Sequence, residues 1–153
     1  MRRIVESCNN SKNVKFKSKD LELFINTLDR TLPENLKAPM GNLSIGVFDN
    51  ADLAKIHLDF LNDPKETDVI TFDGDETGFG GEICVSAERA MQYGPKFGNT
   101  ANRELCLYVA HGYLHLAGVN DIEEEDAKKM RAAEKIALEI LDKNFKQPIF
   151  KFV

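Results

Sequence analysis

The sequence lacks several features that would place it in other classes of protein. No run approaches the eighteen or so apolar residues that a membrane span needs. The N-terminal MRRIVESCNN turns polar too soon for a signal peptide. The 3 cysteines are widely spaced and form no CxxC pair, which is typical of unpaired thiols in a reducing compartment. We therefore expect a cytoplasmic protein without membrane association.

An excess of positive charge is also missing. Lys and Arg number 20 against 25 Asp and Glu, and the formal net charge is -5. Nucleic-acid-binding proteins usually carry a basic surplus, so the composition argues mildly against such a partner. Basic residues do gather near the N-terminus, and there a solvated charged face is favoured over an RNA-binding groove. They are Arg2, Arg3, Lys12, Lys15, Lys17 and Lys19.

Short strands and helices alternate along the chain, whose 153 residues are typical of one domain. β-Branched and apolar residues predict strands at 3–8, 43–48, 67–73 and 81–88. Apolar residues at helical spacing predict helices at 18–31, 50–60, 86–93, between Thr100 and Gly118, and at 122–144. The sequence therefore predicts a single α+β domain over residues 1–153.

His111 and His115 lie one helical turn apart in the segment HGYLHLAGVND. Residues four apart on a helix have Cβ atoms about 6 Å apart, so both imidazoles can reach one ion, and zinc suits them. A third ligand would come from the loop after the helix, where Gly118 permits a sharp reversal. Asp121 is the better candidate in that loop. Three protein ligands leave a fourth position for water, as in catalytic zinc sites.

Asp121 also has a purely structural interpretation. Asp121-Ile122-Glu123-Glu124 matches a D-x-x-E capping box for the last helix, and Asn120 with Glu123 offers a second version. The sequence alone leaves both interpretations open.

The position after the first histidine distinguishes this segment from the HExxH metalloproteases. Those enzymes carry their general base there, whereas this chain has Gly112. Glu104 and Tyr108 lie seven residues before His111 and His115 on the same helical face. Each is a candidate for orienting a histidine or accepting a proton from water, and local packing is an equally good interpretation of both.

Three segments together resemble the YbeY family of single-domain metal-dependent endoribonucleases implicated in ribosomal RNA maturation. HGYLHLAGVND is similar to the family signature HGxLHLxGxDH, TDVITFD to TDVLSF, and GGEICVSAERA to GDIxISxxxA. Their order and spacing agree from about residue 43 to 141. The resemblance implies an α+β fold in which a small, mixed, mostly four-stranded sheet packs against helices, about five here, with a metal site on a central helix.

Carried onto this chain, the resemblance places metal ligands at His111, His115 and Asp121, the last where the family has a third histidine. Two histidines and a carboxylate bind zinc but also suit iron, manganese or nickel, so we expect one Zn²⁺ or another divalent transition metal per chain. The resemblance also associates an arginine before the TDV strand with binding of RNA phosphate. Leu61 stands about there, and Lys65 is the candidate substitute for substrate binding, although lysine lacks the bidentate fork of arginine.

The leading hypothesis is a single-strand-specific, metal-dependent endoribonuclease in ribosomal RNA maturation, notably late processing of the small-subunit rRNA 3' end. RNA and ribosomal components are the expected partners. One alternative is a non-catalytic ribosome assembly factor with a structural metal, which the acidic charge and the missing arginine motivate. Another is a metal-dependent hydrolase of a different substrate, which keeps the site without the RNA.

Overall fold

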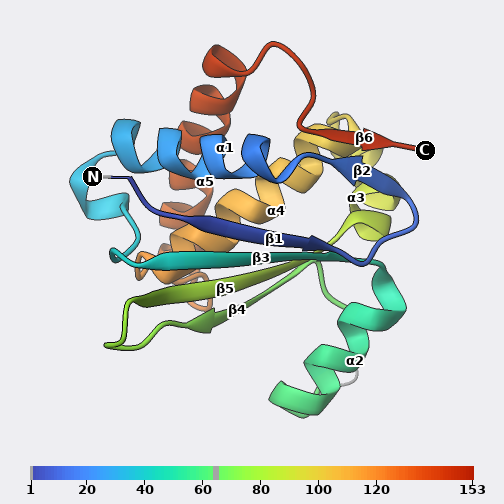
Figure 1. Cartoon of the computed structure of the whole chain (residues 1–153), viewed down its shortest axis with the longest axis horizontal. Coiled ribbons are helices and arrows are strands. Elements are labelled where there is room, and N and C mark those ends of the chain that lie inside the picture. The colour runs from blue at the N-terminus through green and yellow to red at the C-terminus, as the bar shows by residue number, and fades with distance from the viewer. Residues whose placement is uncertain (1, 64–65) are drawn as a thin grey trace.

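A four-stranded mixed sheet lies at the centre of the computed structural model, which describes residues 2–63 and 66–153. Its order is β1-β3-β5-β4 (Figure 1); the first three strands run parallel, and β4 pairs antiparallel with β5. The strands are β1 (Val5–Asn9), β3 (Asn42–Phe48), β4 (Val69–Asp73) and β5 (Phe79–Ser86). All four predicted strands are present with ends shifted by up to two residues, which confirms the α+β class.

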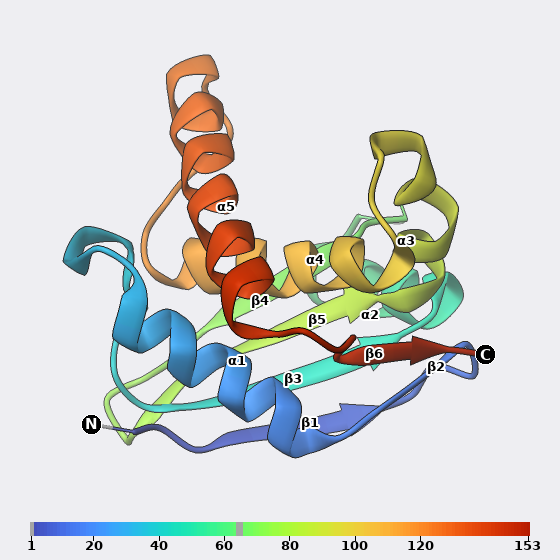
Figure 2. The same ribbon diagram turned by 90° about the horizontal axis from the view of Figure 1, so that it is seen from above.

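Five α-helices and two short 3-10 helices accompany the sheet. They are α1 (Ser18–Thr31), α2 (Asn50–Leu61), α3 (Ala87–Tyr93), α4 (Ala101–Leu116), α5 (Glu124–Asn144), η1 (Glu34–Leu36) and η2 (Pro95–Phe97). Helices α1, α4 and α5 cover one face of the sheet, and α2 lies on the other (Figures 1 and 2). Within the described ranges, no helix is long and apolar enough to cross a membrane.

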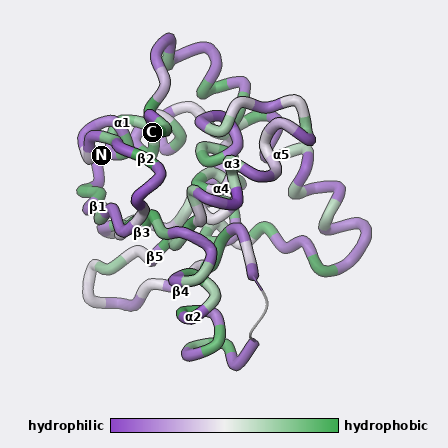
Figure 3. Tube along the Cα trace, turned by 90° about the vertical axis from the view of Figure 1, so that its right-hand side faces the viewer, coloured by the Kyte–Doolittle hydropathy of each residue, from purple (hydrophilic) through white to green (hydrophobic). Residues whose placement is uncertain are grey.

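Alternate residues of the two central strands form the part of the main core that the sheet contributes. Leu43, Ile45 and Val47 of β3 and Ile83 and Val85 of β5 are buried against α1, α4 and α5. Because the helices cover this face of the sheet, the strand residues that point to it are apolar and mostly β-branched. The helices instead alternate between hydrophilic and hydrophobic residues along their length, as the trace in Figure 3 shows, because only one side of each meets the core.

Helix α4 lies directly against the sheet at Gly112. A Cβ atom there would lie 2.5 Å from Ile83 Cγ2 and 3.2 Å from the Cγ2 atoms of Thr71 and Val69. Real Cβ atoms do not approach that closely, so α4 can lie this near β5 and β4 only without a side chain at 112. The residue after His111 therefore faces the sheet, which accounts for the missing glutamate of the HExxH pattern.

A second, two-stranded sheet was not predicted from the sequence. Strands β2 (Val14–Phe16) and β6 (Phe150–Phe152) pair antiparallel, far apart in sequence. Phe16 and Phe150 form an edge-to-face ring contact with centroids 5.3 Å apart. The Phe150 N–H donates to Oδ1 of Asn102 at 2.8 Å, which fixes β6 to the start of α4. Three-residue strands are too short to give a periodic signal.

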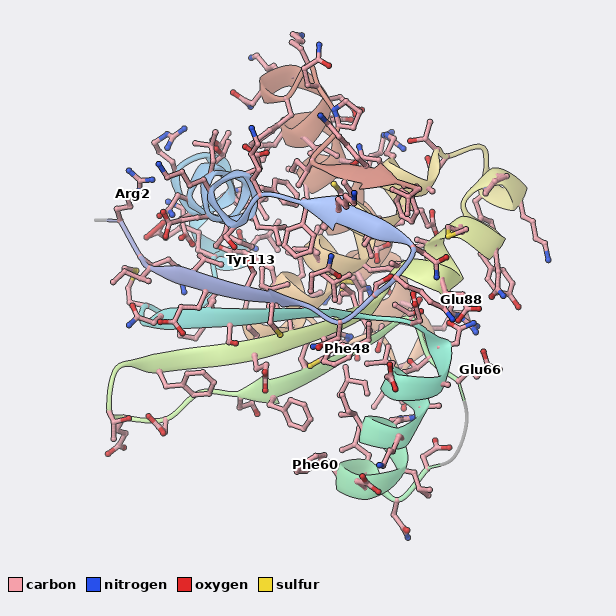
Figure 4. The ribbon with its side chains drawn as sticks, turned by 45° about the vertical axis from the view of Figure 1, so that its right-hand side comes forward. Arg2, Phe48, Phe60, Glu66, Glu88 and Tyr113 are labelled. Carbon is pink, nitrogen blue, oxygen red and sulfur yellow. The ribbon has the colours of Figure 1, made fainter. Side chains whose placement is uncertain are left out.

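Arg3 does not belong to the expected solvated N-terminal face, because it is 3% exposed. Its guanidinium binds Asp29 of α1 through two hydrogen bonds of 2.7 and 2.8 Å. It also donates to the carbonyls of Pro39 and Gly41. Tyr113 of α4, which lies between α1 and the strands in Figure 4, donates its hydroxyl to the same Asp29 carboxylate at 2.6 Å. One buried ion pair thus joins β1, α1, the loop before β3, and α4.

This network yields a stability prediction for Tyr113→Phe. The change removes a hydrogen bond to a charged, largely buried carboxylate, so the free energy of unfolding should fall by roughly 1.5–3 kcal/mol. Tyr93→Phe is the matched control, because the Tyr93 ring packs beneath Arg89 and Lys96 through its face rather than its hydroxyl. Urea denaturation measures both variants, and equal stability of the two would contradict the role assigned to Tyr113.

Candidate metal centre

Three side chains converge where α4 ends. The rings of His111 and His115 are 4.4 Å apart between centroids and nearly perpendicular, at 86°. Oδ2 of Asp121 lies 3.3 Å from Nε2 of His111 and 3.4 Å from Nε2 of His115. All three donor atoms lie within 4.8 Å of one another. The structure therefore brings together the three residues that the sequence predicted as metal ligands.

The backbone after α4 carries Asp121 back toward the histidines. Gly118 has φ +93°, a left-handed conformation that glycine adopts without strain. The N–H of Gly118 donates to the carbonyl of His115, and the N–H of Val119 donates to the carbonyl of Leu114. These two bonds close the end of the helix in the manner of a Schellman motif and reverse the chain, as the sequence predicted.

The capping interpretation of Asp121 is wrong. Helix α5 begins at Glu124, two residues later than predicted, and Glu123 occupies the N-cap position. No side chain makes a capping hydrogen bond there. The Asp121 carboxylate instead faces the two imidazoles, which leaves it available as a ligand.

The spacing of the Asp121 carboxylate from each imidazole fits a tetrahedral ion. Zinc bonds of about 2.0–2.1 Å at tetrahedral angles separate neighbouring ligand atoms by about 3.3 Å. The two distances from Asp121 to the imidazole nitrogens are 3.3 and 3.4 Å. Two imidazoles and a carboxylate are also a donor set that divalent transition metals accept. The residues present therefore fit such an ion, and the donor set leaves its identity open.

Glu134 of α5 is a member of the site that the sequence analysis missed. Its Oε2 accepts a hydrogen bond of 2.6 Å from Nδ1 of His111. This contact fixes the imidazole ring and leaves Nε2 directed at Asp121, as outer carboxylates do for histidine ligands of metals. Burial alone would lower the pKa of His111, but the hydrogen bond to Glu134 and the charges of Glu134, Asp68 and Asp121 raise it. The surroundings of His111 thus favour positive charge.

A signal for Glu134 was present in the sequence. It stands between Met130 and Ala137 at helical spacing, within the stripe of α5 that faces the core. An acidic residue in such a stripe requires a partner, because a buried carboxylate without one is costly.

Asp68 is a second acidic residue near the site that the sequence analysis did not single out. Its negative charge raises the pKa of both His111 and Tyr108, and the residue after it, Val69, packs against α4 at Gly112. Its carbonyl accepts a hydrogen bond from the N–H of Ser86, which ties the residues before β4 to the end of β5. Asp68 belongs to the TDVITFD segment, so its place in a motif was the available signal.

Glu104 interacts with both Tyr108 and Asn99. Glu104 is 3% exposed and accepts a hydrogen bond of 2.8 Å from the Asn99 amide. Burial raises the pKa of Tyr108, as do the charges of Glu104 and Asp68 and a hydrogen bond to Glu104. The carboxylate that orients His111 is Glu134, the partner α5 supplies. Catalytic roles for Glu104 and Tyr108 stay predictions.

The proposed substrate-binding residue, Lys65, lies outside the described residues 2–63 and 66–153. Leu61, which stands about where the resemblance expects an arginine, is the last residue of α2 and is 52% exposed.

Comparison with known proteins identifies the family. The profile of the family described as Endoribonuclease YbeY matches residues 6–142. The chain belongs to the YbeY family. A relative named Endoribonuclease YbeY from Protochlamydia amoebophila (strain UWE25) is 32% identical over 136 residues, or 86% of this chain and 88% of the relative. Another of that name, from Bacillus thuringiensis (strain Al Hakam), is 33% identical over 110 residues, or 63% of this chain and 70% of the relative.

A solved structure agrees with the YbeY assignment. The solution structure of TM1509 from Thermotoga maritima has a TM-score of 0.61 and 26% sequence identity. The match covers 94% of this chain and 91% of that one. These findings confirm the resemblance recognised in the sequence and the fold class that it implied.

The contact between Glu134 and His111 yields a metal-affinity prediction. Glu134→Gln keeps the size of the side chain but removes its charge, so the affinity for Zn²⁺ should fall about 10–100-fold. Glu139→Gln, at an exposed position of the same helix, makes the same change away from His111. Titration against a competing chelator measures both variants. Equal affinities would show that Glu134 does not support the site.

Proposed function

We propose that this chain is a metal-dependent endoribonuclease that cleaves single-stranded RNA during ribosomal RNA maturation, notably in late processing of the small-subunit rRNA 3' end. The observation that carries the proposal is the convergence of His111, His115 and Asp121 in a member of the YbeY family, with the carboxylate 3.3 and 3.4 Å from the two imidazole nitrogens. RNA is the proposed substrate, and ribosomal components are proposed partners because the substrate matures within the ribosome.

Each residue of the site has a distinct task in this proposal. His111 and His115 of α4 would be two ligands of the ion and Asp121 the third, while Glu134 keeps the His111 ring in place. When bound, a Zn²⁺ or similar divalent ion supplies Lewis-acid activation of water and of a phosphodiester oxygen. The same three ligands hold a structural ion equally well, so turnover is what separates the enzyme from a non-catalytic assembly factor.

The proton acceptor is a separate question, because Gly112 replaces the glutamate of the HExxH enzymes. Glu134 is engaged by His111, and Glu104 is buried against Asn99. Burial and the charges of Glu104 and Asp68 raise the pKa of Tyr108 above its usual value, so its phenol is suited to donating a hydrogen bond rather than accepting a proton. We propose Asp68 as the acceptor, because it directly precedes Val69, which packs against α4 at Gly112 beside His111, and because its charge acts on His111.

Space for a polymer lies next to the Asp121 loop. A cavity of about 400 Å³ is lined by the loop residues Gly118 and Asn120 and by Lys129 of α5. Asp126 lines the same cavity, so its charged groups are one of each sign. Lys65 stays a further candidate for contact with the substrate.

The proposed activity predicts metal-dependent cleavage of RNA. Zinc-loaded wild type should cut an unstructured single-stranded RNA, and a chelator should stop the reaction. His115→Ala removes a ligand, so kcat should fall by more than the roughly 100-fold that loss of an outer partner costs. His57→Ala is the matched control, because His57 lies on α2.

Two results would overturn this activity. If the His115→Ala variant still cleaves RNA, the reaction does not depend on the metal ion. A wild type that binds metal, cleaves no RNA and loses ribosome association in His111→Ala would favour the assembly factor.

The role of Asp68 gives a further prediction. Asp68→Asn should lower kcat by about 100-fold or more, because a positioned general base contributes that much, while zinc content stays at one ion per chain. Asp73→Asn, at the exposed end of β4, is the control. Loss of zinc together with activity would make Asp68 a ligand, and unchanged kcat would exclude it from the reaction.

A further inference from the structure

Three lysines share one exposed face of the two-stranded sheet β2–β6. Lys15 and Lys151 are direct cross-strand partners, and both are exposed. Lys17 follows Lys15 by two residues through extended backbone and is exposed too, so it continues the same face. Figure 2 shows this pair of strands at the margin of the molecule, beside the C-terminus. We call Lys15, Lys17 and Lys151 the lysine ribbon.

The ribbon concentrates positive charge without compensation. Like charges directly opposite each other on paired strands destabilise a sheet. Among the described residues, no carboxylate lies within 4.0 Å of any of the three ammonium groups, whereas Lys37 and Arg103 each have an acidic partner. Most other lysines in the described ranges likewise have no carboxylate within 4.0 Å, so what distinguishes this face is the direct cross-strand pairing of Lys15 with Lys151.

The scaffold beneath the ribbon is well anchored. Val14 and Phe150, whose side chains point to the opposite face, are 2% and 1% exposed. The edge-to-face contact of Phe16 with Phe150 and the hydrogen bond from Phe150 to Asn102 fix both strands to the core. The lysines are therefore displayed on a fixed surface rather than on a loose terminal segment, which reduces the ordering cost of binding a ligand.

We propose that the lysine ribbon binds the phosphate backbone of single-stranded RNA at a place separate from the metal centre. The inference rests on the proposed function for the identity of the polymer. Asn102 anchors the ribbon at one end of α4, and His115 lies about 20 Å along that helix at 1.5 Å per residue. An RNA bound at both places extends several nucleotides from the cut, and the ribbon contributes binding that is equal in the ground and transition states.

Lysines on edge strands also have a simpler use, which is to discourage the addition of a further strand. Preventing the addition of a strand requires a charged residue on each edge strand. It does not require Lys15 and Lys151 to lie directly opposite each other. This simpler use predicts self-association when the lysines are neutralised and no effect on RNA.

The salt dependence of RNA binding tests whether the lysine ribbon contacts RNA phosphates. Lys15→Gln/Lys151→Gln is compared with Lys55→Gln/Lys128→Gln, which removes equal charge from helices where acidic residues flank each lysine. Fluorescence anisotropy with a polyuridylate oligonucleotide in chelator measures binding without cleavage. Each phosphate contact on a single strand contributes about 0.7 to the slope of log K against log salt. The ribbon variant lacks two such contacts, so the slope of log K against log salt should be about 1.4 smaller in magnitude. It should bind RNA about 25-fold more weakly near 0.1 M salt.

Thermal denaturation separates this loss from misfolding. Neutralising the facing pair removes a repulsion, so Tm of the ribbon variant should equal or exceed that of wild type. In the cleavage assay the same variant should show a raised KM at unchanged kcat.

Several outcomes would overturn the ribbon proposal. They are affinity and slope equal to those of the control variant, self-association with unchanged RNA binding, and a lysine-dependent effect confined to phosphatidylserine vesicles. Absence of RNA binding by wild type would overturn it as well. Ribbon-dependent binding in a wild type that never cleaves RNA would leave the ribbon in place and overturn only the proposed enzymatic function.

Discussion

The close approach of α4 to the sheet at Gly112 determines the geometry of much of the molecule. With no Cβ at that position, the helix backbone lies against Ile83, Thr71 and Val69. Gly112 faces the strands, while Tyr113 after it reaches Asp29 of α1 and His111 before it reaches Glu134 of α5. His111 and His115 both approach Asp121 of the returning loop, so the placement of α4 sets where these two side chains lie.

Contacts on two sides hold α4 in that position. On one side, Tyr113 donates to Asp29, whose carboxylate also binds the buried Arg3. On the other side, Glu134 of α5 binds His111. The first contact is a buried charge network that orders four segments of the chain, and the second orients a ligand. Stability and metal binding are therefore linked through the placement of one helix.

Local patterns predicted the parts of this protein that depend on local geometry. The i, i+4 spacing of His111 and His115 was sufficient for the histidine pair, and runs of β-branched and apolar residues were sufficient for the main strands. The role of Asp121 stayed open because a metal ligand and a helix cap produce the same sequence pattern. The backbone after Gly118 decided between these two roles. Glu134 and Arg3 were missed because their partners come from other elements, at separations that no periodicity reports.

The central claim is that His111, His115 and Asp121 hold one divalent ion. Anomalous scattering at the zinc edge, from crystals grown with Zn²⁺, tests it most directly. We predict a single peak bonded to Nε2 of both histidines and to a carboxylate oxygen of Asp121, at about 2.0–2.2 Å. A peak elsewhere in the molecule, or an Asp121 carboxylate turned away to cap α5 beside an empty histidine pair, would contradict the account.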